Sequence, residues 1–219
     1  MDKSMRRVMC AIALVACFAL PALADSVTYT NLGAGGSYDP SGFYPISGIG
    51  LGTYQSYAGQ FTASVGGTLS QIDLGLYNPR MGTNAAVISV YTDVSNALGA
   101  LLFSSAPVSV PFYNSTTTLL TSVSSSSGKL VAGDNYFLVV APAATDTGLG
   151  WFLNNTGATG TLLYNSGSSG WISLGSSSKL PPFDVRVNTA VTPEPSTWLT
   201  LGTGLVGLLG TARRKRLLS

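Results

Sequence analysis

The chain contains no histidine, and its only two cysteines, Cys10 and Cys17, lie close to the N-terminus. Histidine is the commonest general base and transition-metal ligand in proteins, and cysteine supplies thiol nucleophiles and disulfides. Charge is also scarce, because Asp, Glu, Lys and Arg make up only 9% of the sequence. Beyond the first 24 residues, these absences exclude thiol- and histidine-dependent catalysis and a disulfide-stabilised fold.

The first 24 residues have the layout of a secretory signal peptide, with cleavage expected before Asp25. They comprise three basic residues, an apolar run and a small-residue cleavage pair: Lys3, Arg6 and Arg7, then 8–20, then Ala22 and Ala24. Cleavage there removes both cysteines. A second interpretation stays open, because the residues before Cys17 also fit the box that precedes the lipid-modified cysteine of bacterial lipoproteins.

The C-terminal segment has a second ordered pattern. A Pro-Glu-Pro sequence is followed by an uncharged stretch and four cations: Pro193, Glu194 and Pro195, then 198–212, then Arg213, Arg214, Lys215 and Arg216. The uncharged stretch is shorter than the ~20 residues that span a bilayer comfortably, and cations behind it resist translocation. We therefore expect a short transmembrane helix that holds the exported part briefly. A permanent single-span anchor is the other interpretation.

This order of elements over residues 193–216 resembles the PEP-CTERM sorting signal. The resemblance implies that an exosortase, a multi-pass membrane processing enzyme, recognises Pro193, Glu194 and Pro195 and removes the tail. It also implies a Gram-negative host that makes exopolysaccharide, and a destination at the cell surface or in the extracellular biofilm matrix.

Between these ends, residues 25–192 form the exported part. They carry seven Asp and four Lys or Arg residues, which gives a net charge of −3. A domain of this charge has no basic surface with which to attract nucleic acid. Its length is sufficient for one sizeable hydrophobic core and too short for two.

Short runs with period-two alternation, rich in Val, Ile, Thr, Tyr and Phe, fill the exported part. Such runs predict strands, and we expect eleven of them: 27–32, 56–63, 68–77, 85–92, 101–105, 117–123, 136–140, 150–154, 161–164, 171–174 and 183–188. The run at 136–140 is apolar on both faces, which predicts a central strand. The regular spacing predicts an all-β fold, an antiparallel two-sheet β-sandwich of jelly-roll or lectin-like type.

A second resemblance covers residues 31–187. It is carried by strand patterns and short motifs: Asn31-Leu32-Gly33, Ser37-Tyr38, Gln60-Phe61-Thr62, Leu69-x-x-Ile72-x-Leu74, Val90-Tyr91-Thr92-Asp93, 136–140, and Trp151-x-x-Asn154-Asn155-Thr156-Gly157. Together they resemble the choice-of-anchor extracellular domains of type R. That family shares one domain with different C-terminal anchors, and it brings no established catalytic residues.

Paired carboxylates are the one hydrolytic chemistry that the composition leaves open. The candidates are Asp73, Asp93, Asp134 and Asp146, and the sequence gives no sign that any two of them converge. Asp39, or Asp93 with Asn96, has the oxygen ligands that calcium prefers, but a role in turns is the favoured interpretation. We expect no enzyme, no catalytic site, no metal and no cofactor.

Three aromatic residues in consecutive predicted strands, Trp151, Tyr164 and Trp171, are candidates for stacking on sugar rings, with Asn154 and Asn155 bonding to hydroxyls. The favoured interpretation of both tryptophans is that they anchor the core. The sequence as a whole predicts an exported structural or adhesive protein of the surface or matrix. A carbohydrate-binding module for the matrix polysaccharide is the alternative.

Overall fold

Seventeen strands and two 3-10 turns account for the regular structure of the computed structural model, which describes residues 23–113 and 118–190. The strands are β1 (Leu23–Thr30), β2 (Asp39–Ser47), β3 (Ser56–Thr62), β4 (Gly67–Leu74), β5 (Leu76–Met81), β6 (Ala85–Val94), β7 (Ala97–Ser104), β8 (Val108–Ser109), β9 (Thr121–Ser124), β10 (Lys129–Leu130), β11 (Asn135–Pro142), β12 (Gly148–Leu153), β13 (Thr159–Gly160), β14 (Leu162–Asn165), β15 (Trp171–Ser173), β16 (Ser178–Lys179) and β17 (Phe183–Ala190). The turns are η1 (Ala34–Gly36) and η2 (Ile49–Leu51). Asp25 to Thr189 make up one compact unit.

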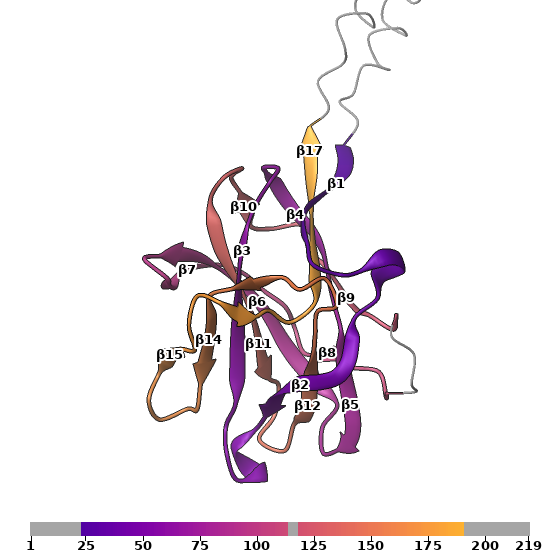
Figure 1. Cartoon of the computed structure of the whole chain (residues 1–219), viewed down its shortest axis with the longest axis vertical. Coiled ribbons are helices and arrows are strands. Elements are labelled where there is room, and N and C mark those ends of the chain that lie inside the picture. The colour runs from indigo at the N-terminus through magenta and orange to yellow at the C-terminus, as the bar shows by residue number, and fades with distance from the viewer. Residues whose placement is uncertain (1–22, 114–117, 191–219) are drawn as a thin grey trace, which may run out of the picture. The chain divides into compact units, whose positions relative to one another are not determined.

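These strands form four sheets (Figure 1). A five-stranded sheet has the order β1-β17-β4-β10, with β9 also on β4, and a seven-stranded sheet has the order β15-β14-β3-β11-β6-β7, with β8 also on β6. The smaller sheets are β2-β12-β5 and β13-β16. Pairing is antiparallel, as between β11 and both its neighbours or between β17 and β4. The all-β prediction is confirmed, although the strands are divided among four sheets where two were predicted.

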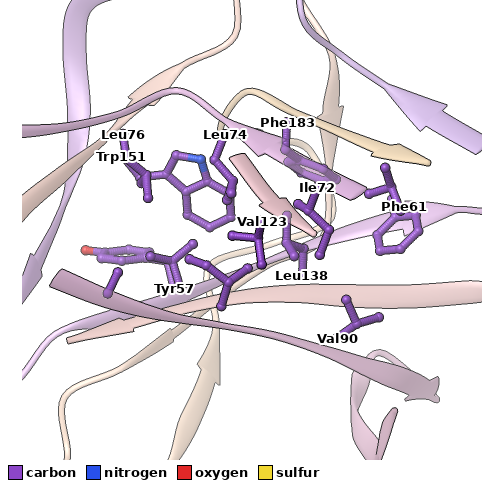
Figure 2. Close-up of a cluster of buried hydrophobic side chains, with 14 of the residues drawn as sticks. Tyr57, Phe61, Ile72, Leu74, Leu76, Val90, Val123, Leu138, Trp151 and Phe183 are labelled. Carbon is purple, nitrogen blue, oxygen red and sulfur yellow. The ribbon is translucent and has the colours of Figure 1, made fainter. Parts of the chain in front are cut away.

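The main core gathers large side chains from the five-, seven- and three-stranded sheets (Figure 2). Trp151, Phe183 and Leu138 are fully buried there, and each such side chain contributes about 1.5–3 kcal/mol relative to leaving it exposed. A smaller cluster covers the other face of β11, where Phe137 and Val139 pack with Leu163. Burial on both faces confirms β11 as the central strand that its sequence predicted.

Two differences from the predicted strands have clear causes. The predicted strand at 68–77 is two strands, β4 and β5, which separate at Gly75; a Cβ there would lie 2.8 Å from Pro182 and 2.9 Å from Tyr38. The second difference is β2, which sequence patterning missed because it contains Pro40, Gly42 and Pro45. Prolines are tolerated in β2 because it is an edge strand of its sheet.

The two ends of the domain differ in which elements they carry. In Figure 1 the N-terminal end of β1 and the C-terminal end of β17 lie at one end, and β2, β12 and β5 lie toward the opposite end. The apolar run 8–20 of the predicted signal peptide, expected to be helical, and the predicted transmembrane helix at 198–212 lie outside the described residues, whereas Leu23 and Ala24 begin β1. Within residues 23–113 and 118–190, neither 3-10 turn has the length or hydropathy that a membrane span requires.

Candidate functional site

The three aromatic residues predicted to contact sugars occupy different environments. Trp151 has no exposed surface, and its indole N–H donates to the carbonyl of Pro182 at 3.2 Å. Tyr164 is half-buried against Tyr57, with ring centroids 5.1 Å apart, and half-buried Trp171 packs on the smaller cluster of β11. Trp151 is thus a core anchor, and its proposed sugar contact is wrong because no ring face is accessible. The three residues do not form one surface.

The amide of Asn154, also expected near sugar hydroxyls, is buried and fully engaged. Its Nδ2 donates to the carbonyls of Ala158 and Leu180, and its Oδ1 accepts from the backbone N–H groups of Thr156 and Ala158. The Asn154 side chain therefore stabilises the loop after β12 through hydrogen bonds to its backbone. Asn155 is more exposed and donates to Ser37 Oγ at 2.9 Å.

A different group of aromatic rings lies at the surface of the three-stranded sheet, and we call it the surface aromatic cluster: Tyr38, Phe43, Tyr77, Tyr113 and Phe152. Phe152 is its centre, stacked on Tyr77 at 4.5 Å and on Tyr38 at 4.9 Å. Phe43 and Tyr113 contact Tyr77 edge-on, and they are 49% and 41% exposed. The cluster is therefore closed on its inner side and open to water on its outer side.

Alternation along β12 separates this cluster from the core. Successive side chains of a strand point to opposite faces, so Trp151 enters the core while Phe152 points outward beside its cross-strand partner Phe43. Gly150 makes room for the stack, because a Cβ at that position would overlap the ring of Tyr77. Without a side chain at 150, the Tyr77 ring lies across β12 and reaches Phe152.

A hollow of about 480 Å³ adjoins the cluster at the end of β5, and we call it the Arg80 hollow: Asn78, Arg80, Gly82, Asn84 and Phe112. Arg80 has a left-handed backbone with φ 68°, which costs a non-glycine residue about 1–2 kcal/mol. Its N–H donates to Oδ1 of the buried Asn78 side chain at 2.5 Å. The Arg80 guanidinium carbon lies 5.2 Å from the centre of the Phe112 ring, within cation–π range.

Two carboxylates do meet, but only one of them was among the sequence candidates. Asp73 on β4 and Asp184 on β17 are direct cross-strand partners, and both are nearly buried. Arg186 lies between them, 3.1 Å from Asp184 and 4.0 Å from Asp73. Burial raises the pKa of Asp184, the Arg186 charge opposes that rise, and Asp73 adds a smaller increase.

The oxygens of this pair are engaged in holding strands together. Asp73 accepts hydrogen bonds from Gln71 and from Ser122 on β9, and Arg186 extends the network to Asp25 on β1. The arrangement is an ion-pair network across four strands. Its sequence signal was Asp184-x-Arg186, whose spacing places both side chains on one face of a strand, while the partner Asp73 could be found only from the register.

The remaining candidate carboxylates lie in or beside turns. Asp93 Oδ1 accepts from the N–H of Asn96 at 2.7 Å across the β6–β7 turn. Asp93 and Asp134 line one hollow of about 550 Å³, and Asp146 accepts from Thr83 Oγ1 at 2.7 Å. Hydrogen bonds from Ser41 and the Lys179 charge lower the pKa of Asp39 to about 2. No group of three acidic side chains suited to a metal ion occurs in residues 23–113 and 118–190.

The predicted sorting residues lie beyond the described part of the chain, apart from Ala24, which is in β1. Those outside it are Ala22, Pro193, Glu194, Pro195, Arg213, Arg214, Lys215 and Arg216. The two cysteines lie outside it as well.

Comparison with known proteins gives one informative match. Residues 191–216 match the PEP-CTERM protein-sorting motif, and no curated protein matches the chain. Among solved structures, the complex of Aeromonas sobria serine protease with the chaperone ORF2 aligns over 83% of this chain at 13% identity. The chain spans 30% of that protein, and a TM-score of 0.34 does not establish a shared fold. The matched motif implies that this chain is an extracellular surface protein sorted by an exosortase.

Proposed function

We propose that this protein is a structural or adhesive component of the cell surface or of an exopolysaccharide matrix, delivered there after an exosortase removes its tail. The observation that carries the proposal is the motif at residues 191–216. The domain ahead of it supports such a role, because it is disulfide-free and weakly charged. The carboxylate pair of Asp73 and Asp184 is engaged by Arg186. A domain of choice-of-anchor type R and an absence of catalysis are part of the same proposal.

Processing is tested by replacing Pro193, Glu194 and Pro195 together with alanine in the native host. We expect the variant to stay in the membrane fraction at its full C-terminal length. A variant with Ser196→Ala and Thr197→Ala, next to the motif's three recognition residues, serves as the control and should be processed normally. Release of the triple variant with an unchanged mass contradicts the proposal.

A carbohydrate-binding role is the second candidate, and the surface aromatic cluster favours it. Aromatic rings that are half exposed on an otherwise folded face are typical of interaction sites, and a sugar's polarised C–H groups suit the negative face of a ring. In a host strain that makes no exopolysaccharide, we expect the protein to move from the cell surface to the medium. An unchanged distribution would count against this role.

A further inference from the structure

Arg80 is an exposed cation without an ionic partner in the described part of the chain. The domain has four cations, and two of them are paired, Lys179 with Asp39 and Arg186 with three aspartates. Arg80 instead lies over the Phe112 ring, in a domain whose net charge is −3. A cation left unpaired on an acidic domain, at the edge of a hollow, is complementary to an anionic ligand.

The position of Arg80 is fixed by its surroundings. Its left-handed backbone is a conformation that glycine or asparagine usually adopts, and the buried Asn78 side chain holds it through the Arg80 N–H. Asn78 also forms a bridge to Phe112, and its carbonyl accepts the N–H of Tyr113. The backbones of Arg80, Phe112 and Tyr113 are thus held by one residue.

We propose that the Arg80 hollow binds an acidic sugar residue of a polysaccharide, with the sugar's carboxylate on Arg80 and its C–H face on Phe112. The planar guanidinium matches a carboxylate in two parallel hydrogen bonds. The amide of Asn84, whose Nδ2 also donates to Ser109 Oγ, lines the same hollow and suits a sugar hydroxyl. This inference rests on the proposed extracellular role and adds to it the ligand's chemical class.

The surface aromatic cluster extends this site beyond one sugar. Tyr113 follows Phe112 in the chain and contacts Tyr77 and Phe152, so the rings continue from the hollow across the three-stranded sheet. Phe112 and Phe43 are each 49% exposed. A polymer with successive sugar rings suits such a row.

The test is affinity electrophoresis of the full-length chain in non-ionic detergent, with polygalacturonate as the acidic polymer and dextran as the neutral one. We expect retardation by polygalacturonate, weakened by salt, and none by dextran. Arg80→Asn, which keeps a residue that tolerates positive φ, and Phe112→Ala should each weaken binding roughly tenfold. Thermal unfolding of each variant checks that the fold is intact.

The matched controls are Lys129→Asn, another exposed cation without an ion pair in the described ranges, and Leu174→Ala, an apolar side chain of similar exposure. Both should bind like the wild type. The proposal is overturned if polygalacturonate does not retard the chain, if dextran retards it equally, or if the two site variants match the controls. It is also overturned if Phe112→Ala instead breaks a dimer seen by light scattering. Because the assay uses unprocessed protein, failed sorting in the host leaves its result unaffected.

Discussion

Trp151 and Phe152 are neighbours on β12, yet they belong to two different kinds of packing. Trp151 is enclosed by the main core, where it contacts Phe183 and bonds to Pro182. Phe152 is also buried, but it packs against other aromatic rings, one of which, Tyr113, is itself 41% exposed. The inner face of β12 thus packs into the closed main core. The outer face is an aromatic layer whose exposed members, Phe43 and Tyr113, are available to a ligand.

The largest expected effect is that of removing the inner ring. Trp151→Ala should lower the free energy of unfolding by about 3–5 kcal/mol, the range for a large aromatic deleted from a core. Phe152→Ala should cost less, because rings at an open surface can close over the gap. Chemical denaturation of both variants measures the difference, and equal costs would break the comparison between the two faces.

Gly150→Ala tests whether the ring stack depends on the missing side chain. The added methyl group would overlap the Tyr77 ring, so we expect a loss of about 1–3 kcal/mol, as for overpacking. In the double variant with Tyr77→Ala the overlap is gone, and the two costs should be far from additive. Additive losses in the denaturation experiment would show that the cost of Gly150→Ala does not come from its overlap with the Tyr77 ring.

Phe43→Ala sharpens the comparison at the exposed edge of the aromatic layer. Phe43 is half exposed and contacts Tyr77 edge-on at 5.1 Å. The loss in stability should be about 0.5–1.5 kcal/mol, the contribution of one aromatic pair. Thermal unfolding measures it against Ile172→Ala, which is similarly exposed on β15. A cost as large as that of Trp151→Ala would mean that the outer layer belongs to the core.

The smallest effect concerns the ion pair that ties β2, the neighbour of β12, to β16. The folded-state pKa of Asp39 is about 2, below its ordinary value of about 3.9. Its ionised form therefore stabilises the fold fully above the unfolded-state pKa, and this contribution is lost as the pH falls toward 2. Asp39→Asn should be slightly less stable than the wild type at pH 7.

Unfolding of the wild type and Asp39→Asn at a series of pH values checks the direction in which this stability difference changes with pH. The gap between them should close between about pH 4 and pH 2, because the wild-type carboxyl becomes neutral there. Lys179→Gln should reduce the gap at pH 7 as well. A gap that persists at pH 2 contradicts the assignment of the effect to this carboxylate.

The sequence predicted features that depend on local pattern. Alternation located most of the longer strands, and the doubly apolar run at 136–140 located the central strand β11. Prediction from the sequence pattern failed where long-range packing overrides the local signals. The prolines of β2 interrupt the pattern that would have predicted this edge strand. The separation of β4 from β5 depends on Pro182, which lies about 107 residues beyond Gly75 in the chain.

The same distinction explains what could be predicted of the sites. The sorting motif is contiguous and could be recognised directly, as the match at residues 191–216 confirms. The surface aromatic cluster assembles rings from residue 38 to residue 152, and the Asp73–Asp184 pair depends on one strand register. No spacing in the sequence brings these residues together, so they became visible only with the topology.

The central claim, export followed by removal of the tail, is tested most directly by intact-mass spectrometry of the protein from the host's surface or medium, compared with its membrane fraction. We predict a surface form that begins at Asp25 and lacks the uncharged stretch at 198–212 and the basic residues after it. A surface form that retains its full C-terminus would contradict the claim, and a lipid on Cys17 would contradict the predicted signal cleavage.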